Sequence, residues 1–228
     1  MKICGISDMH GQYTFDIEPC DLLLICGDVI PLEIQFYTKP SKKWFNKVFI
    51  PWCEKQPCKK VMFIGGNHDF FICEHEEEIK DMFKDNEKIS YLSNSYEEFE
   101  GVKIYGTPWS KTFGRWWFMK SDDELNEMFE KDMENITGSD IIISHDAPFG
   151  CSDILLQKDC PWTTGQNIGT KALRNLIEAV KPKLFLHGHL HSTNHEKEVL
   201  FDADVYNVSL LDENYTMSYK PLYVYFNK

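Results

Sequence analysis

The sequence predicts an α/β fold in which two β-sheets pack face to face between outer layers of helices. Short apolar runs bounded by glycine and polar residues recur up to about residue 190, and such runs are typical of buried strands. Amphipathic stretches with helical periodicity alternate with these runs. After about residue 197 only strand-like segments follow. Alternating strands and helices followed by consecutive strands favour an α/β/β/α sandwich.

Five predicted strands end in polar residues. They are KICGIS before Asp8, DLLLICG before Asp28, KVMFIGG before Asn67, DIIIS before His145 and KLFLHG before His189. In an open α/β sheet the loops at the carboxyl ends of the strands converge on a crevice where ligands bind. One polar residue after a strand is ordinary turn chemistry, but five such strand ends together predict a functional site.

Four stretches are predicted to be helical. They are residues 41–56, which Pro51 interrupts, residues 74–85, residues 121–136 and residues 170–181. The third opens with Ser121 and has Glu124 three residues later, which is the pattern of a capping box. The last is stopped by Pro182, because proline cannot continue a helix. Strands are expected again in residues 197–212 and 221–226.

The composition indicates one globular domain spanning residues 1–228. The chain is 43% hydrophobic and 14% aromatic, so it can bury a large core, and no repeat or low-complexity linker is visible. It has no apolar run of 18 or more residues, and its N-terminus lacks the pattern of a signal peptide. We therefore expect a cytoplasmic protein with no membrane partner. Its eight cysteines are expected to be free thiols, with metal binding by Cys53 and Cys58 as the alternative.

The charge of the chain restricts its partners. A formal net charge of −12 repels polyanions at long range, so binding to nucleic-acid polymers is disfavoured. A small phosphorylated substrate remains compatible with this charge, because bound metal ions would reverse the local field. The oligomeric state is not predicted.

Three of the eight histidines lie within FLHGHLHS, residues 185–192. His187, His189 and His191 would point the same way in an extended segment, because strand side chains alternate with a period of two. Packing does not explain such a concentration of imidazole, whereas metal binding does. We expect His187, which lies inside the strand, to be a core or supporting residue.

The strand ends supply enough candidate ligands for two metal ions. These are Asp8, His10, Asp28, Asn67, His145, His189 and His191. Oxygen donors mixed with imidazole suit Mn, Fe, Zn or Co better than Ca or Mg alone. Seven ligands exceed one tetrahedral site and fit two ions about 3.5–4 Å apart.

The motifs DMH, GD, GNHD, SH and GHLH, in this order, resemble those of the calcineurin-like metallophosphoesterase superfamily over residues 3 to about 191. The resemblance implies a first metal held by Asp8, His10 and His191, and a second held by Asn67, His145 and His189. It implies that Asp28 bridges the two metals, of which manganese is favoured, and that His68 is the general acid. Asp28 and His68 are thus the predicted catalytic residues, in a reaction where hydroxide between the metals attacks phosphorus.

The second motif departs from that of the protein phosphatases in this superfamily. They typically read GD-x-x-D-R-G, whereas this chain reads GDVIPLE, with Pro31 and Leu32 at the Asp and Arg positions. The arginine that would bind a phosphomonoester is missing, and so is the acid that would orient the histidine. The segments 104–118 and 144–153 instead resemble a small branch that includes cyclic-nucleotide phosphodiesterases.

The sequence therefore predicts a phosphodiesterase for a small substrate such as a cyclic nucleotide. Asn67, His68 and Trp109 are expected to contact the substrate, with Trp116 as a second candidate for stacking on a base. The alternatives are a phosphomonoesterase and a non-catalytic scaffold or protein-binding module on the same fold, with an exonuclease third. An intact His189, where some relatives carry glycine, favours a fully loaded site.

Overall fold

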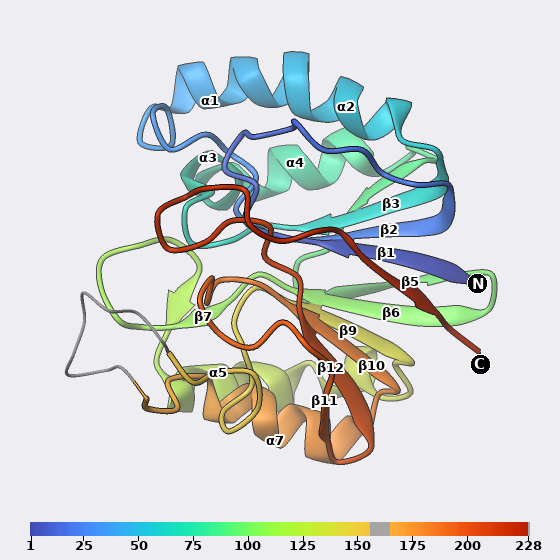
Figure 1. Ribbon diagram of the computed structural model, residues 1–228, viewed down its shortest axis with the longest axis vertical. Coiled ribbons are helices and arrows are strands. Elements are labelled where there is room, and N and C mark those ends of the chain that lie inside the picture. Colours follow the sequence, from blue (N-terminus) through green and yellow to red (C-terminus); the bar gives the residue numbers. More distant parts are fainter. Residues whose placement is uncertain (156–164, 228) are drawn as a thin grey trace.

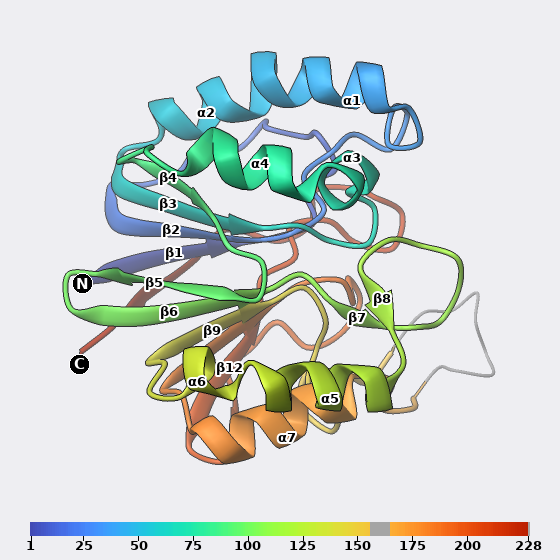
Figure 2. The same ribbon diagram turned by 180° about the vertical axis from the view of Figure 1, so that it is seen from behind.

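The computed structural model describes residues 1–155 and 165–227, and these form four layers (Figure 1). Helices α1–α4 cover one face of the first sheet, whose other face packs on the second sheet. Helices α5 and α7 cover the far face of the second sheet, as Figure 2 shows from behind. This arrangement confirms the predicted α/β/β/α sandwich. Cys160 lies outside the described residues.

The first sheet has five strands in the order β13-β1-β2-β3-β4. Strands β1 to β4 are mutually parallel, and β13 pairs antiparallel with β1. The strands are β1 (Lys2–Ile6), β2 (Cys20–Cys26), β3 (Cys58–Ile64), β4 (Ile89–Tyr91) and β13 (Leu222–Tyr225).

The second sheet has six strands in the order β11-β12-β10-β9-β6-β5. Its four central strands are parallel, and both edge strands are antiparallel. The strands are β5 (Ser95–Phe99), β6 (Val102–Thr107), β9 (Ile141–Ser144), β10 (Leu184–His187), β11 (Glu198–Leu200) and β12 (Ala203–Asn207). A separate two-stranded pair joins β7 (Ser110–Lys111) to β8 (Met119–Lys120).

The helices fall close to their predicted positions, except α3, which was not predicted. They are α1 (Thr38–Trp44), the π-helix η1 (Phe45–Phe49), α2 (Ile50–Lys55), α3 (Phe70–Glu74), α4 (Glu76–Phe83), α5 (Asp122–Lys131), α6 (Met133–Ile136) and α7 (Lys171–Val180). The Ser121–Glu124 capping box is present in full at the start of α5. Lys181 adopts a left-handed conformation after α7, so that helix ends just before Pro182 as expected.

Two helices differ from the prediction in their interiors. Pro51 does not stop the helix around it, because the π-turn of η1 precedes α2 and places the proline in the first turn of α2, where its missing N–H costs little. The predicted helix 121–136 breaks at Asp132 instead of running through. The side chain of Asp132 accepts a hydrogen bond from the hydroxyl of Tyr105 at 2.7 Å, which ties the break to β6.

The core lies in three layers that follow from the strand pattern. Alternate residues of the central strands face opposite sides, so each sheet contributes one apolar face to the inter-sheet core and another to its helices. The inter-sheet layer contains Leu22, Leu24, Ile64, Ile143 and Leu186, all fully buried. His187 is also fully buried, as predicted. No helix among the described residues has the length and apolar character needed to cross a membrane.

Candidate metal centre

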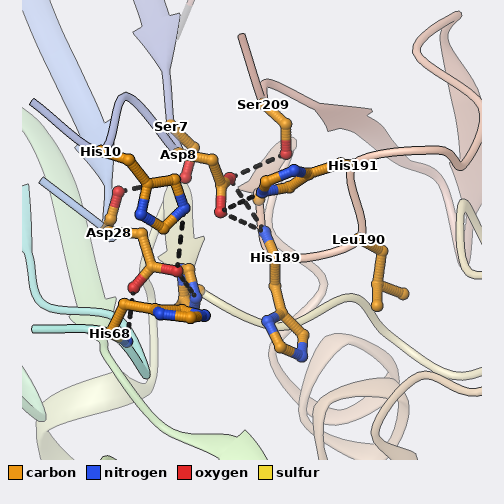
Figure 3. Close-up of polar contacts among 12 residues, drawn as sticks. Ser7, Asp8, His10, Asp28, His68, His189, Leu190, His191 and Ser209 are labelled. Carbon is orange, nitrogen blue, oxygen red and sulfur yellow. Dashed lines mark hydrogen bonds and ion pairs between the residues drawn. The ribbon is translucent and has the colours of Figure 1, made fainter. Parts of the chain in front are cut away.

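The ends of β1 and β10 meet where the two sheets adjoin (Figure 3). Asp8 follows β1 and His191 follows β10, and Nε2 of His191 lies 3.2 Å from Oδ1 of Asp8. The Nδ1 atom of His191 donates to the backbone carbonyl of Asp212 at 3.0 Å, which leaves Nε2 as the nitrogen directed at the carboxylate. Asp8, His10 and His191 offer ligand atoms that all lie within 4.8 Å of one another.

A second group of ligand atoms includes the same aspartate. Asp8, Asp28 and His145 also offer ligand atoms within 4.8 Å of one another. Nε2 of His145 lies 3.3 Å from Oδ2 of Asp28, and Nδ1 of His145 donates to the carbonyl oxygen of Cys26 at 2.8 Å. Asp8 thus belongs to both groups, whereas the sequence resemblance gives the bridging position to Asp28.

Asn67 and His189 lie beside the second group. Oδ1 of Asn67 is 2.8 Å from Nε2 of His145. The backbone N–H of His189 donates to Oδ2 of Asp8 at 3.0 Å, and its ring centroid is 5.1 Å from that of His145. In Figure 3 the His189 ring points away from the Asp8 carboxylate. Among the described residues, therefore, the side chain of His189 adjoins the ligand groups without belonging to either of them.

Four of the predicted ligands adopt backbone conformations that non-glycine residues rarely adopt. The φ angles are 54° at Asp8, 42° at His10, 53° at Asp28 and 67° at His189. Left-handed conformations cost energy for residues with a Cβ, and they concentrate at functional sites, where the surrounding structure maintains them. Here the strained residues follow β1, β2 and β10, and three of them, Asp8, His10 and Asp28, direct their side chains toward one another.

Glycines let the backbone approach these carboxylates closely. A Cβ on Gly188 would collide with Oγ of Ser7 and Oδ2 of Asp8. A Cβ on Gly66 would likewise collide with Oδ1 of Asp28. These two glycines, from the GHLH and GNHD motifs, are therefore required by packing around the ligand oxygens.

The donor set fits a divalent cation. Both ring nitrogens of His10 are buried and have no hydrogen-bond partner among the described residues, although Nε2 lies 3.6 Å from Oδ2 of Asp28. A buried polar atom without a partner is costly, so such atoms are rare outside functional sites. Imidazole nitrogens beside buried carboxylates match the ligands of Mn, Fe, Zn and Co sites.

The protonation of the ligands without metals follows from their burial and charge. Burial is the largest single effect on His145 and disfavours its charged form. The charge and hydrogen bond of Asp28, with smaller contributions from Asp8 and the carbonyl of Cys26, together outweigh burial and raise the pKa of His145 to about 10. In the same way Asp8 raises the pKa of His191 to about 9 against the effect of burial. Burial lowers the pKa of His10 to about 4. At neutral pH two imidazolium ions thus balance the two carboxylates.

His68 lies next to the ligand groups. Its backbone N–H donates to Oδ1 of Asp28 at 2.8 Å. Its Nδ1 is 2.6 Å from Oε1 of Gln35, and its ring contacts Trp116 with centroids 4.3 Å apart. Burial lowers the pKa of His68, and the charge of Asp28 only partly offsets that effect. A half-buried imidazole beside the ligands can exchange a proton with a group bound there.

Trp109 contacts residues other than the candidate ligands. Its ring packs edge-on against Phe118, with centroids 5.5 Å apart, and Nζ of Lys120 lies 4.4 Å above it. Trp116 is the tryptophan that contacts His68. Among the described contacts none joins Trp109 to the candidate ligands, so its role in substrate binding stays a prediction.

Several supporting residues were not assigned a role from the sequence. Ser209 donates to Oδ2 of Asp8 at 2.7 Å, and the ring of Tyr215 lies 5.1 Å from that of His10. The buried carboxylate of Asp69 accepts hydrogen bonds from the backbone of Val29, Ile30 and Gly66. Asp69 could have been identified from its position in the GNHD motif. Ser209 and Tyr215 lie in the C-terminal segment and belong to no recognised motif.

Comparison with known proteins finds one family that matches most of the chain. A family model described as calcineurin-like phosphoesterase matches residues 1–193, which include every predicted ligand. The UPF0046 protein T07D4.2 of Caenorhabditis elegans is 28% identical over 221 residues, covering 84% of this chain and 51% of that protein. Human metallophosphoesterase domain-containing protein 1 is 26% identical over 209 residues, covering 82% and 59%. The chain therefore spans only half to three fifths of the length of these relatives.

Solved structures show the same fold at low sequence identity. One crystal structure superimposes with a TM-score of 0.63 at 13% identity, covering 90% of this chain and 89% of the other. The crystal structure of TT1561 of Thermus thermophilus has a TM-score of 0.55 at 12% identity, covering 90% and 88%. Because the family model matches residues 1–193, the chain belongs to the calcineurin-like phosphoesterase family.

Proposed function

We propose that the protein is a metal-dependent phosphodiesterase that hydrolyses small phosphodiesters such as cyclic nucleotides. The observation that carries this proposal is the convergence of two ligand groups on Asp8, at the carboxyl ends of strands from both sheets. Membership of the calcineurin-like phosphoesterase family supports the same chemistry.

The candidate ligands would form two sets, each holding one cation. Asp8, His10 and His191 would hold one, and Asp28, His145 and Asn67 would hold the other, with His189 near the second. Two divalent cations, manganese in the favoured case, supply Lewis acidity that activates water and neutralises charge on phosphoryl oxygens. The hydrogen bonds from His145 to Cys26 and from His191 to Asp212 fix each ring with Nε2 directed inward.

His68 would act on the leaving group. Its Nδ1 is occupied by Gln35, so Nε2 is the nitrogen available to a bound substrate. In the imidazolium form of His68, the proton on Nε2 would pass to the departing oxygen as the phosphorus–oxygen bond breaks, which leaves the neutral ring with its proton on Nδ1. The hydrogen bond from its backbone N–H to Asp28 fixes the main chain of His68 beside the ligands.

The surface beside His68 supports a substrate with a planar apolar group. Trp116 contacts the His68 ring and stacks on Phe36, with centroids 6.0 Å apart. Phe36 is exposed, and so is Phe113, whose ring lies 5.2 Å from that of His189. Aromatic faces at these positions could stack on a nucleobase whose phosphodiester lies at the metal ligands.

The missing arginine argues for a diester over a monoester. Leu32 stands where protein phosphatases of this superfamily carry that arginine, and Nζ of Lys111 donates to the carbonyl of Gly169 at 3.1 Å. A phosphomonoester carries more negative charge than a diester and needs more cationic donors. A diester needs fewer cationic donors than a monoester, so it suits the residues present better.

Hydrolysis of bis-p-nitrophenyl phosphate and of p-nitrophenyl phosphate tests the proposal. The protein is treated with a chelator, and Mn²⁺ is then added back. We expect metal-dependent cleavage with a preference for the diester. Preference for the monoester would establish a phosphomonoesterase instead. Metal binding without cleavage of either compound, or of cyclic nucleotides, would favour the non-catalytic scaffold.

A further inference from the structure

The turn after β2 places a glutamine where it can replace a missing acid. The phosphatase-type motif would put an aspartate at Pro31, but proline cannot orient a histidine. The segment instead closes a turn in which the N–H of Ile34 donates to the carbonyl of Pro31 at 3.1 Å. Gln35 follows this turn with its side chain inward and is only 6% exposed. The turn thereby delivers a carboxamide to the site shortly after Pro31.

The His68 ring is restrained from several sides. Oε1 of Gln35 lies 2.6 Å from Nδ1, which is a short hydrogen bond. Trp116 contacts the ring at 4.3 Å between centroids, and His10 meets it edge-on at 5.0 Å. Aromatic contacts limit tilting of the ring, but among the contacts of residues 1–155 and 165–227 only the hydrogen bond from Nδ1 distinguishes its two nitrogens.

We propose that Gln35 is a positioning residue. Its Oε1 accepts a hydrogen bond from the Nδ1–H of His68, so that Nε2 faces the leaving group. The inference rests on the role given to His68 in the proposed function. It assigns to an uncharged carboxamide the orienting task that the family motif gives to a carboxylate. Nothing in the sequence motifs marks Gln35, because its place depends on the turn at 31–34.

The chemistry of the two partners differs in one respect. A carboxylate and a carboxamide oxygen both accept a hydrogen bond from Nδ1 and fix the same tautomer. Only the carboxylate adds a negative charge, and Asp28 already supplies one against the backbone of His68. A neutral partner therefore orients the ring without a further buried charge, which would be costly in this site.

The NMR spectrum of the metal-free protein tests the hydrogen bond without any assay of activity. Long-range ¹H–¹⁵N spectra report which ring nitrogen of His68 carries the proton in the neutral form. We expect the Nδ1–H tautomer in the wild type and a mixture in Gln35→Leu. An Nε2–H tautomer in the wild type would overturn the proposal, because Nδ1 would then be the acceptor.

Kinetics of the manganese-loaded enzyme test the consequence for catalysis. Bis-p-nitrophenyl phosphate releases a stable anion, whereas diphenyl phosphate has a poorer leaving group that depends more on protonation. We expect Gln35→Leu to lower kcat for diphenyl phosphate by about 10- to 100-fold, and for the nitrophenyl diester by much less. KM and metal content should stay close to the wild-type values.

Matched variants separate positioning from general damage. Gln35→Glu keeps an acceptor oxygen and should retain more activity than Gln35→Leu. Gln35→Asn, whose side chain is one methylene shorter, replaces Gln35→Leu in these tests if the leucine variant does not fold. Gln56→Leu removes another glutamine, bonded to the carbonyl of Trp52, and should change neither tautomer nor kcat. In a His68→Ala background, Gln35→Leu should have no further effect on kcat.

The outcomes distinguish this inference from the proposed function. Equal losses for both diesters, or an undiminished effect of Gln35→Leu in the His68→Ala background, would overturn the positioning role. Absence of hydrolysis by the metal-loaded wild type would refute the proposed function, while the NMR result would still decide the Gln35–His68 hydrogen bond.

Discussion

Oδ1 of Asp8 lies 3.2 Å from Nε2 of His191, so the first motif of the chain meets the last. Asp8 follows a strand of the first sheet, and His191 follows a strand of the second. The candidate metal centre is thus divided between two sheets whose relative position is set by the inter-sheet core. Leu24 of the first sheet and Leu186 of the second are both fully buried in that core.

Asp28→Asn is expected to abolish both metal retention and hydrolysis. The substituted carboxamide would keep an oxygen for the backbone N–H of His68, which Asp28 binds at 2.8 Å, but it would lose the negative charge beside His145. Metal content after dialysis and turnover of bis-p-nitrophenyl phosphate are the measurements. The exposed Asp16→Asn is the control and should behave as wild type. Full metal content in the Asp28→Asn protein would contradict its assigned role.

His68→Ala should separate metal binding from turnover. The side chain lies outside both ligand groups, so the metal content should stay at the wild-type level. Loss of the proton donor should lower kcat by about 10²–10⁴-fold for substrates with poor leaving groups. An unchanged kcat for such a substrate would remove His68 from the mechanism, whereas loss of metal would make it a ligand.

The stability of the metal-free protein should fall as the pH rises above neutrality. The pKa values of His145 and His191 are raised from 6.5 to about 10 and about 9 by their aspartate partners, against the opposing effect of burial. The stabilisation from these two imidazolium ions is complete below pH 6.5 and is lost as the pH passes through 9 and 10. Thermal unfolding in the presence of a chelator, between pH 6.5 and 10, measures it.

Manganese should have the opposite dependence on pH. The metal binds neutral imidazole, so His145 and His191 must release protons when it binds, and the affinity should rise with pH. The gain in melting temperature on adding Mn²⁺ should therefore increase from pH 6.5 toward pH 9. A gain that shrank over this range would show that neither histidine loses a proton on metal binding.

Gly188→Ala should impair the metal centre with little effect on the rest of the fold. Its Cβ would press on Ser7 and on Oδ2 of Asp8, which must shift away from the ligand group. Reduced Mn²⁺ affinity in calorimetric titrations is the expected result. Gly138→Ala is the comparison, because its positive φ of 76° makes alanine strained although no atom lies near the new Cβ. That variant should lose about 1 kcal/mol of stability while keeping wild-type metal affinity.

The sandwich was predictable because its signals are local. Buried parallel strands appear as continuous apolar runs, and Ser121 with Glu124 marks a helix start without tertiary information. Strands β4 to β6 were not assigned, because SYEEF in β5 has alternating exposure with weak apolar character and β4 has three residues. The break at Asp132 depends on a hydrogen bond from Tyr105 in another element, which periodicity does not reveal.

The candidate site was predictable where motifs end strands and not where loops supply the contacts. The carboxyl ends of parallel strands converge by rule, so Asp8, Asp28 and His145 could be placed together from the sequence. Gln35 and Ser209 could not, because they reach His68 and Asp8 through irregular segments whose paths depend on packing. The orientation of the His189 ring, away from the Asp8 carboxylate, was likewise not foreseen.

Titration of the metal-free protein with Mn²⁺, following diester hydrolysis and bound metal in the same samples, tests the central claim most directly. The ligand groups around Asp8 predict activity that rises with metal content and levels off at two ions per chain. Activity that levelled off at one ion would contradict a dinuclear centre. Hydrolysis that continued undiminished in the chelated protein would contradict the metal-dependent mechanism altogether.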